Sequence, residues 1–232
     1  MIDKKETGEW YNRPNELWVW LNSIIQNGAR VLDIGPGKSP FFKATHFIDA
    51  YWDQGFSVSN LDKMAAYVTC NVDVEDIPFP DKYFDFVFSS HVLEDLHYPT
   101  RLCKEMSRVG KAGISMTPSP LVEFCRGTES SWRGYYHHNW FVYSNDGVLC
   151  FLDKNITIEH LDFPFEESVE KLILGNPWLA HTYHYWDGEL LFRNIDYGRY
   201  NGHIENYPGA ILTAIREGAS GTREFLSTLI GR

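Results

Sequence analysis

The stretch "VLDIGPGKSPFF", residues 31–42, decides how the chain is interpreted, because an apolar run breaks directly into a loop rich in glycine. The run holds Asp33 near its end, and Gly35 and Gly37 follow on either side of a proline. A buried strand that feeds a glycine-rich turn commonly brings backbone close to a nucleotide in α/β proteins. The stretch therefore predicts a nucleotide-type site, and its spacing indicates which kind.

Two phosphate-binding motifs fit this spacing poorly. A P-loop needs GxxxxGK[ST], and Leu32 stands where its first glycine should be, so the "GKS" at residues 37–39 is not a P-loop. A dinucleotide fingerprint needs GxGxxG and an acidic residue about 20 positions on. Here Pro40 replaces the third glycine and Asp49 comes too early. The dinucleotide interpretation is weakened but stays open.

The surrounding chain alternates apolar runs with helical patterns. A helix is expected in "RPNELWVWLNSIIQNGA", with Asn15 as its cap, and a second in "PTRLCKEMSRVG". Strands are expected in "ARVLDIG", "HFIDAY", "MAAYVTCNVDV", "YFDFVFSS" and "AGISMTPSP", the third ending at Asp73. Strands that alternate with helices or short crossovers predict a mostly parallel sheet with helices on both faces. Ligands of such sheets bind at the carboxyl ends of the strands.

After about residue 120 the pattern changes to a segment rich in Trp, Tyr, His and Gly, with "SNDG" as a hairpin turn. We expect this segment, about 119–185, to be an insertion that covers the ligand edge of the sheet. A late strand in "GELLFRNI" and two helical pieces in "YPGAILTAIREG" and "TREFLSTLIG" should follow. The prediction is one domain over residues 1–232, with a cofactor-binding core at about 29–118.

The motif D-x-G-x-G in "DIGPG", together with "NVDVEDIPFPDKYFDFVFSSHVLEDLHYP", resembles the class I S-adenosylmethionine-dependent methyltransferases, in the methyltransferase type 11-like subgroup. The resemblance covers about residues 29–118 and implies a Rossmann-like fold with S-adenosyl-L-methionine as cofactor. Two features depart from it. Only 11 residues separate Gly37 from Asp49, so the first crossover helix should be short or missing. Asp95 stands where the subgroup usually has histidine, with His97 two residues on.

The resemblance also implies residue roles at the methionine end of the cofactor. Gly35 and Gly37 would line the amino-acid moiety, where the absence of side chains lets backbone approach the ligand. Asp33 would position the cofactor's amino group or the loop itself. Ser90, at the end of the fourth expected strand, would lie near the methionine end.

At the nucleoside end the resemblance implies two carboxylates and one backbone amide. Asp49 would accept hydrogen bonds from both ribose hydroxyls, since each carboxylate oxygen can take one donor. Asp73 would accept from the adenine amino group, and the Val74 amide would donate to a ring nitrogen. Tyr11 and Arg13 could close over the cofactor as a lid, although an untethered solvated segment explains them equally well.

Methyl transfer to a weakly acidic hydroxyl needs a base, and histidine suits this role near neutral pH. His137 and His138 in "YYHHNW" are the leading candidates, and His91 is nearly as good. His181 and His184 are expected to be structural. No metal is expected, because "NDG" at residues 145–147 and Asp153 form no recognisable ligand set.

The expected activity is O-methylation of a small-molecule or sugar hydroxyl, with a small-molecule or carbohydrate acceptor as the partner. Aromatic side chains stack on sugar faces, and the expected insertion supplies Trp132, Tyr135, Tyr136 and Trp140. The alternatives are a non-catalytic S-adenosylmethionine-binding regulatory protein, or an N-methyltransferase or protein methyltransferase.

Composition limits the remaining classes. The 232 residues carry a formal net charge of −10, which disfavours a nucleic-acid partner because phosphate backbones attract basic surfaces. No apolar run approaches the roughly 18 residues that a membrane span needs. The first ten residues lack the apolar core of a signal peptide, and the four cysteines form no CxxC pair. We therefore expect a cytoplasmic protein with reduced thiols, of undetermined oligomeric state.

Overall fold

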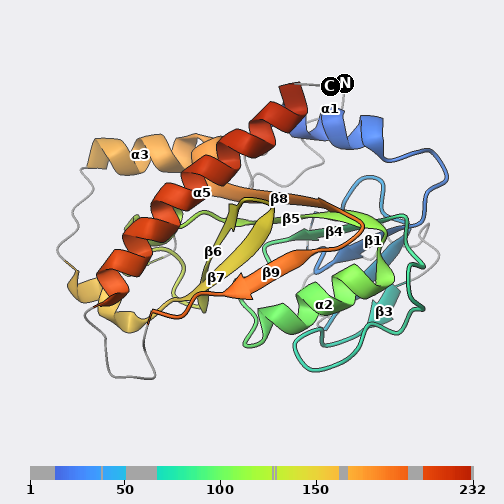
Figure 1. Cartoon of the computed structure of the whole chain (residues 1–232), viewed down its shortest axis with the longest axis horizontal. Coiled ribbons are helices and arrows are strands. Elements are labelled where there is room, and N and C mark those ends of the chain that lie inside the picture. The colour runs from blue at the N-terminus through green and yellow to red at the C-terminus, as the bar shows by residue number, and fades with distance from the viewer. Residues whose placement is uncertain are drawn as a thin grey trace.

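The computed structural model describes residues 14–37, 39–50, 67–126, 128, 130–161, 167–197 and 206–230. Within them the chain forms a six-stranded main sheet, in the order β3-β2-β1-β4-β5-β8, and a three-stranded sheet, in the order β6-β7-β9 (Figure 1). The predicted α/β architecture is confirmed. The main sheet is parallel except for β8, which pairs antiparallel with β5 at its edge.

The five predicted strands of the main sheet are all present. They are β1 (Val31–Ile34), β2 (His46–Asp49), β3 (Tyr67–Thr69), β4 (Phe86–Ser90) and β5 (Ala112–Pro118). The third was expected to run to Asp73, and this was wrong. The chain turns at Asn71, whose side chain accepts from the Asp73 amide and whose carbonyl accepts from the Val74 amide. A side chain that bonds its neighbouring backbone in this way favours a turn over a continued strand.

Helices cover both faces of the main sheet, as predicted. On one face α2 (Pro99–Val109) packs against Leu32, Ile34 and Val87. On the other, α1 (Asn15–Ile24) and the far end of α5 (Tyr207–Ile230) pack against Val31, Phe86 and Phe88. Alternate residues of β1 and β4 thus enter opposite cores, because successive side chains of a strand point to opposite faces.

The first helix differs from the prediction at its start. Pro14 is the N-cap and Asn15 is the first helical residue, with no side-chain capping hydrogen bond. Proline already has the extended backbone that a cap position requires, here φ −67° and ψ 136°. The buried stripe of Leu17, Trp20 and Leu21 is as expected.

The smaller sheet contains β6 (Trp140–Asn145), β7 (Val148–Asp153) and β9 (Leu191–Asn194). The predicted "SNDG" hairpin joins β6 to β7, with Asp146 and Gly147 both at positive φ, 49° and 71°. Two positive φ angles in succession are typical of a type I′ turn, whose twist matches paired strands. One face of this sheet joins the α2 core, and the other packs beneath α5 (Figure 1).

The two helical pieces expected near the end of the chain are one continuous helix, α5, so that division was wrong. In the sequence, the glycines between the two pieces suggest a helix break. In the structure they allow α5 to pack closely against β6. A Cβ added at Gly221 would overlap the backbone of Ser144 on β6, and one at Gly218 would lie 3.2 Å from Tyr143 Cβ. Gly in a helix costs about 1 kcal/mol relative to Ala, which this close packing offsets.

The segment between β5 and β8 leaves and re-enters the main sheet at one point. Pro118, the last residue of β5, pairs with His181, the first residue of β8 (His181–Asp187). Ser119 N donates to Ala180 O at 2.8 Å. Besides β6 and β7, this segment holds short helices: η2 (Val122–Phe124), η3 (Ile156–His160), α3 (Glu167–Gly175) and α4 (Pro177–Ala180).

Two expectations from the sequence concern helices. The described residues between β1 and β2 contain no helix, which agrees with the prediction that the first crossover helix is short or missing. Among the helices in the described ranges, none combines the length and apolar character needed to cross a bilayer.

Candidate active site

The candidate site lies where the strand order of the main sheet reverses. The chain places β2 and β3 on one side of β1, and β4 and β5 on the other. Ligands of open parallel sheets bind in the crevice outside the carboxyl ends of the strands at such a reversal. Gly35 directly follows β1 and His91 directly follows β4, so these two loops border the crevice.

The glycine loop is closely packed at Gly35 and unobstructed at Gly37. Gly35 has φ +64°, its N–H donates to Ile48 O at 2.8 Å, and a Cβ there would come within 2.5 Å of Val92 Cγ2. Gly37 has φ +51°, and a Cβ there would meet nothing within 4 Å. Both positive φ angles and the free space beside Gly37 fit a loop whose backbone approaches a ligand.

Asp33 holds this loop in place through a hydrogen bond to its far end. Its side chain is 1% exposed, and Oδ2 accepts a hydrogen bond of 2.7 Å from the Phe41 amide at the far end of the loop. Phe41 in turn stacks on Phe88 of β4, with ring centroids 4.3 Å apart. Of the two roles that the resemblance implied for Asp33, the geometry therefore favours positioning of the loop.

Three further predicted positions lie along the same edge. Asp49 is the last residue of β2 and is partly exposed there. Asp73 lies beyond β3, where its Oδ1 accepts from the Tyr98 amide at 2.8 Å and its Oδ2 from the His97 amide at 3.2 Å. The side chain of Val74 is 60% exposed, and its amide donates to Asn71 O at 3.0 Å. Tyr11 and Arg13 lie outside the described residues.

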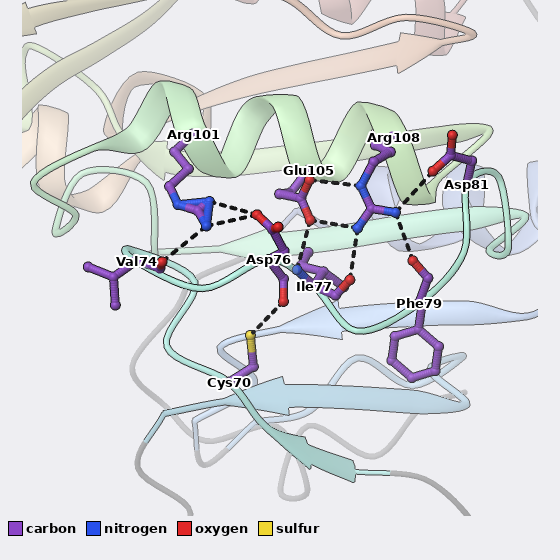
Figure 2. Close-up of polar contacts among 9 residues, drawn as sticks. All are labelled: Cys70, Val74, Asp76, Ile77, Phe79, Asp81, Arg101, Glu105 and Arg108. Carbon is purple, nitrogen blue, oxygen red and sulfur yellow. Dashed lines mark hydrogen bonds and ion pairs between the residues drawn. The ribbon is translucent and has the colours of Figure 1, made fainter.

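Polar contacts from α2 hold the loop over residues 74–81, directly after Asp73, as Figure 2 shows. Glu105 Oε2 accepts from the buried Ile77 amide at 2.7 Å, and Arg108 Nη2 donates to Ile77 O at 2.8 Å. Arg101 Nη2 donates to Val74 O at 3.0 Å. The hydrogen bond with Arg108 holds the pKa of Glu105 below its ordinary value, although burial opposes it. The loop is therefore anchored at several points by one helix.

Directly after β4 the chain turns sharply and leads to Glu94, a buried acidic residue. Ser90 ends the strand, and His91 adopts φ 57°, which is uncommon for a residue with a side chain. His91 Nδ1 lies 3.4 Å from Oε1 of Glu94, whose side chain is 1% exposed. Burial raises the pKa of Glu94 well above its ordinary value, and the Asp95 and Glu123 carboxylates add to the shift. Burial thus favours the neutral form of the Glu94 carboxyl.

The paired histidines meet this loop from the segment between β5 and β8. His138 Nδ1 lies 2.7 Å from Oε1 of Glu123, and His138 Nε2 lies 3.5 Å from Oδ1 of Asp95. His137 Nε2 lies 3.6 Å from the same Asp95 oxygen. Burial would raise the pKa of Glu123, but the contacts with His138 and with Lys154 outweigh it and lower that pKa. The imidazole of His138 therefore lies between two carboxylates.

Backbone and side-chain contacts hold the two segments together. Asn139 N donates to Glu94 O at 2.7 Å, and its side chain donates to Asp95 O at 2.7 Å. Trp140 Nε1 donates to Leu96 O at 2.8 Å. The prediction that this aromatic segment lies over the ligand edge thus gains direct contacts with the loop after β4. Trp132 and Tyr136 are 48% and 68% exposed, so they present ring surface to solvent.

His181 and His184 lie on β8, and both side chains are buried. His184 Nδ1 lies 2.8 Å from Ser144 Oγ, and burial lowers its pKa to about 4, so the ring is neutral. His181 Nδ1 contacts Pro177 O at 3.2 Å, and its ring lies against that of His91, with centroids 5.2 Å apart.

Sequence reasoning missed Glu94, Glu123 and Lys154. A weak signal exists for Glu123, a single charge in the apolar run "PLVEFC", since an isolated charge at a buried position needs a partner. Its partner Lys154 lies 31 positions on in the chain, so the spacing alone could not identify it.

The strand order and the glycine loop at the reversal show a Rossmann-like sheet, and a family match identifies it as that of the class I methyltransferases, whose cofactor is S-adenosylmethionine. Residues 32–115 match the model of a family described as "Methyltransferase domain". This match over residues 32–115 confirms the resemblance to the class I S-adenosylmethionine-dependent methyltransferases.

Similar proteins include the ubiquinone/menaquinone biosynthesis C-methyltransferase UbiE of Burkholderia mallei (strain SAVP1), 28% identical over 123 residues, which are 48% of this chain and 49% of the relative. The chain thus spans about half the length of the curated relatives it matches. A S-adenosylmethionine-dependent methyltransferase from Aquifex aeolicus is 20% identical over 46% of this chain and 65% of its own, with a TM-score of 0.37. One from Mesorhizobium loti is 14% identical over 86% and 80%, with a TM-score of 0.40.

Proposed function

We propose that the chain transfers the methyl group of S-adenosylmethionine to a hydroxyl of a small molecule or sugar. The observation that carries the proposal is His91, which follows β4 directly at the reversal of strand order, beside the glycine loop that Val92 contacts at Gly35. A general base must lie within reach of the proton that it removes. His91 meets this condition if the acceptor enters between the two loops.

The cofactor supplies an electrophilic methyl group, and the protein's residues bind and orient both reactants. We assign the ribose hydroxyls to the Asp49 carboxylate. A carboxylate has about four lone-pair sites, so Asp73 keeps acceptor capacity for the adenine amino group despite its bonds to the loop after Leu96. The backbone of Gly35 and Gly37 then faces the methionine end, with Asp33 holding that loop.

His91 takes up the hydroxyl proton in this proposal. Glu94 Oε1 lies 3.4 Å from Nδ1 without forming a hydrogen bond, and His91 Nε2 is buried. Shortening of the contact with Glu94 on acceptor binding would fix Nδ1–H and direct Nε2 toward the proton. His138 is the weaker candidate, because its two nitrogens face the carboxylates of Glu123 and Asp95. The expectation that His137 or His138 is the base stays a prediction.

Exposed aromatic rings support a flat or sugar-like acceptor. Trp132 and Tyr136 present ring surface on the segment that carries the histidine pair. A ring of this kind can stack on the apolar face of a sugar or on a phenol. Phenols also belong in the acceptor screen because UbiE is named as a C-methyltransferase of ubiquinone/menaquinone biosynthesis.

Calorimetry with S-adenosylmethionine and S-adenosylhomocysteine tests the cofactor assignment. Asp49→Ala should abolish binding, because it removes the acceptor assigned to both ribose hydroxyls. Asp187→Ala is the matched control, since Asp187 is an exposed carboxylate at the opposite end of the sheet, paired with the first residue of β5. Absence of binding in the wild type, or equal binding by the two variants, would contradict the assignment.

Turnover is tested over nucleotide sugars, glycosides and phenols. His91→Gln should keep cofactor binding and lower kcat about 100-fold or more, the usual contribution of a general base. Full activity of His91→Gln would exclude His91 as the base. Cofactor binding without turnover on any acceptor would favour the regulatory-protein alternative.

A further inference from the structure

Three side chains beside the crevice converge on one point. We propose that Asp95, His137 and His138 bind a single divalent transition-metal ion, with Zn²⁺ as the reference ion. Asp95 comes from the loop after β4, and the two histidines come from the segment between β5 and β8. One ligand atom from each of the three lies within 4.8 Å of the other two.

The spacing of the three ligand atoms suits a tetrahedral ion. Zinc binds imidazole nitrogen and carboxylate oxygen at about 2.0–2.2 Å, so two ligands of a tetrahedral ion lie about 3.4 Å apart. Asp95 Oδ1 lies 3.6 Å from His137 Nε2 and 3.5 Å from His138 Nε2. Two edges of the coordination tetrahedron therefore already have nearly the required length. A direct hydrogen bond would be shorter, at about 2.7–3.2 Å.

The outer partners of His138 also suit metal binding. A ligating histidine usually donates its second ring N–H to a carboxylate, which fixes the tautomer and turns the other nitrogen toward the metal. His138 Nδ1 lies 2.7 Å from Oε1 of Glu123, and Glu123 is 1% exposed. Lys154 contacts the other carboxylate oxygen and donates to Tyr135 O at 2.7 Å. Glu123 is thus held in place as an acceptor for the Nδ1–H of His138.

Exposure differs among the three ligands in a way that leaves a route for the ion. The side chain of His138 is 3% exposed, whereas those of Asp95 and His137 are 42% and 44% exposed. The protein interior therefore holds His138 in position, and the other two ligands face solvent. Two imidazoles and one carboxylate are a donor set found at zinc and non-haem iron sites that keep a position for water or substrate.

This inference goes beyond the proposed function and does not depend on it, because metal binding is measured directly. The 232-residue chain is dialysed against a chelator and titrated with Zn²⁺ by calorimetry. The wild type should bind one ion per chain, and Co²⁺ should give the visible absorption of a tetrahedral site. Absence of saturable Zn²⁺ binding would overturn the proposal in favour of plain ion pairs between Asp95 and the histidines.

Variants locate the site. Asp95→Asn and His137→Ala change partly exposed side chains and should lower Zn²⁺ affinity at least 10-fold. Glu123→Gln should lower it 10- to 100-fold, as loss of an outer partner does. His160→Ala, which removes an exposed histidine on η3, is the control and should bind as the wild type does. Equal affinity in Asp95→Asn, His137→Ala and the wild type would overturn the proposal.

Calorimetry with S-adenosylmethionine on the same preparations separates the two proposals. Asp95→Asn should bind the cofactor as the wild type does, because it removes only a metal ligand. If cofactor binding fails in the wild type while Zn²⁺ still binds, the proposed function is wrong and the metal site stands.

Discussion

Replacing Gly35 by alanine should destabilise the protein more than the same replacement at Gly37. Both residues have positive φ, +64° and +51°, so both variants incur the strain of a left-handed backbone, about 1–2 kcal/mol. Only at Gly35 would the new Cβ lie 2.5 Å from Val92 Cγ2. Forcing an extra methyl into filled space costs a further ~1–3 kcal/mol. The expected loss is thus about 2–5 kcal/mol for Gly35→Ala and about 1–2 kcal/mol for Gly37→Ala.

Urea unfolding followed by circular dichroism gives both free energies. The contact is isolated by a double-mutant cycle, in which Val92→Ala removes the methyl groups that the new Cβ would meet. Gly35→Ala should cost less in the Val92→Ala background than in the wild type, approaching the Gly37→Ala value. If the two glycine variants are equally stable, or if Val92→Ala brings no relief, the contact between the two loops at the crevice is not as described.

Two further predictions concern pH, and both are read from urea unfolding across a pH series. The contacts of Glu105 with Arg108 lower the pKa of Glu105. The stabilisation that ionised Glu105 gives the folded state is therefore present above the unfolded pKa of 4.5 and is lost as pH falls through the folded pKa. Glu105→Gln should destabilise the protein at pH 7 and have little effect in acid. Burial lowers the pKa of His184 from 6.5 to about 4, so the native state should lose about 3 kcal/mol relative to the unfolded chain as pH falls between these values. His184→Asn should remove that dependence, and an unchanged pH profile would refute the argument.

Much of the sheet could be predicted from the sequence because its strands are continuous apolar runs that end in polar residues. The absence of a helix after Gly37 could be predicted too, since the 11 residues before Asp49 leave too little chain for a regular crossover. β8 could not, because "HTYHYWD" carries two histidines and a threonine that are buried in the sheet. Their burial depends on neighbours that the local pattern does not show.

Part of the candidate site could likewise be predicted from the sequence, and part could not. Carboxylates near strand ends follow from strand positions, so Asp33 and Asp49 could be placed at one edge, whereas Asp73 lies in a turn beyond β3. The cluster around His138 could not, because its members come from distant parts of the chain: Asp95 lies 43 positions before His138, and Glu123 lies 15 before it. Which of several histidines meets which acid is decided by tertiary packing rather than by spacing.

The paired ends of the segment between β5 and β8 have a consequence for how this protein could diversify. Because Pro118 and His181 are cross-strand partners, the sheet itself closes the intervening loop of chain. Lengthening such a loop adds little entropic cost, about 0.6 kcal/mol for each doubling. Exposed loops within residues 119–180 can therefore be lengthened during evolution with the register of β5 and β8 unchanged. New acceptor preferences could arise on an inherited cofactor sheet, one surface segment at a time.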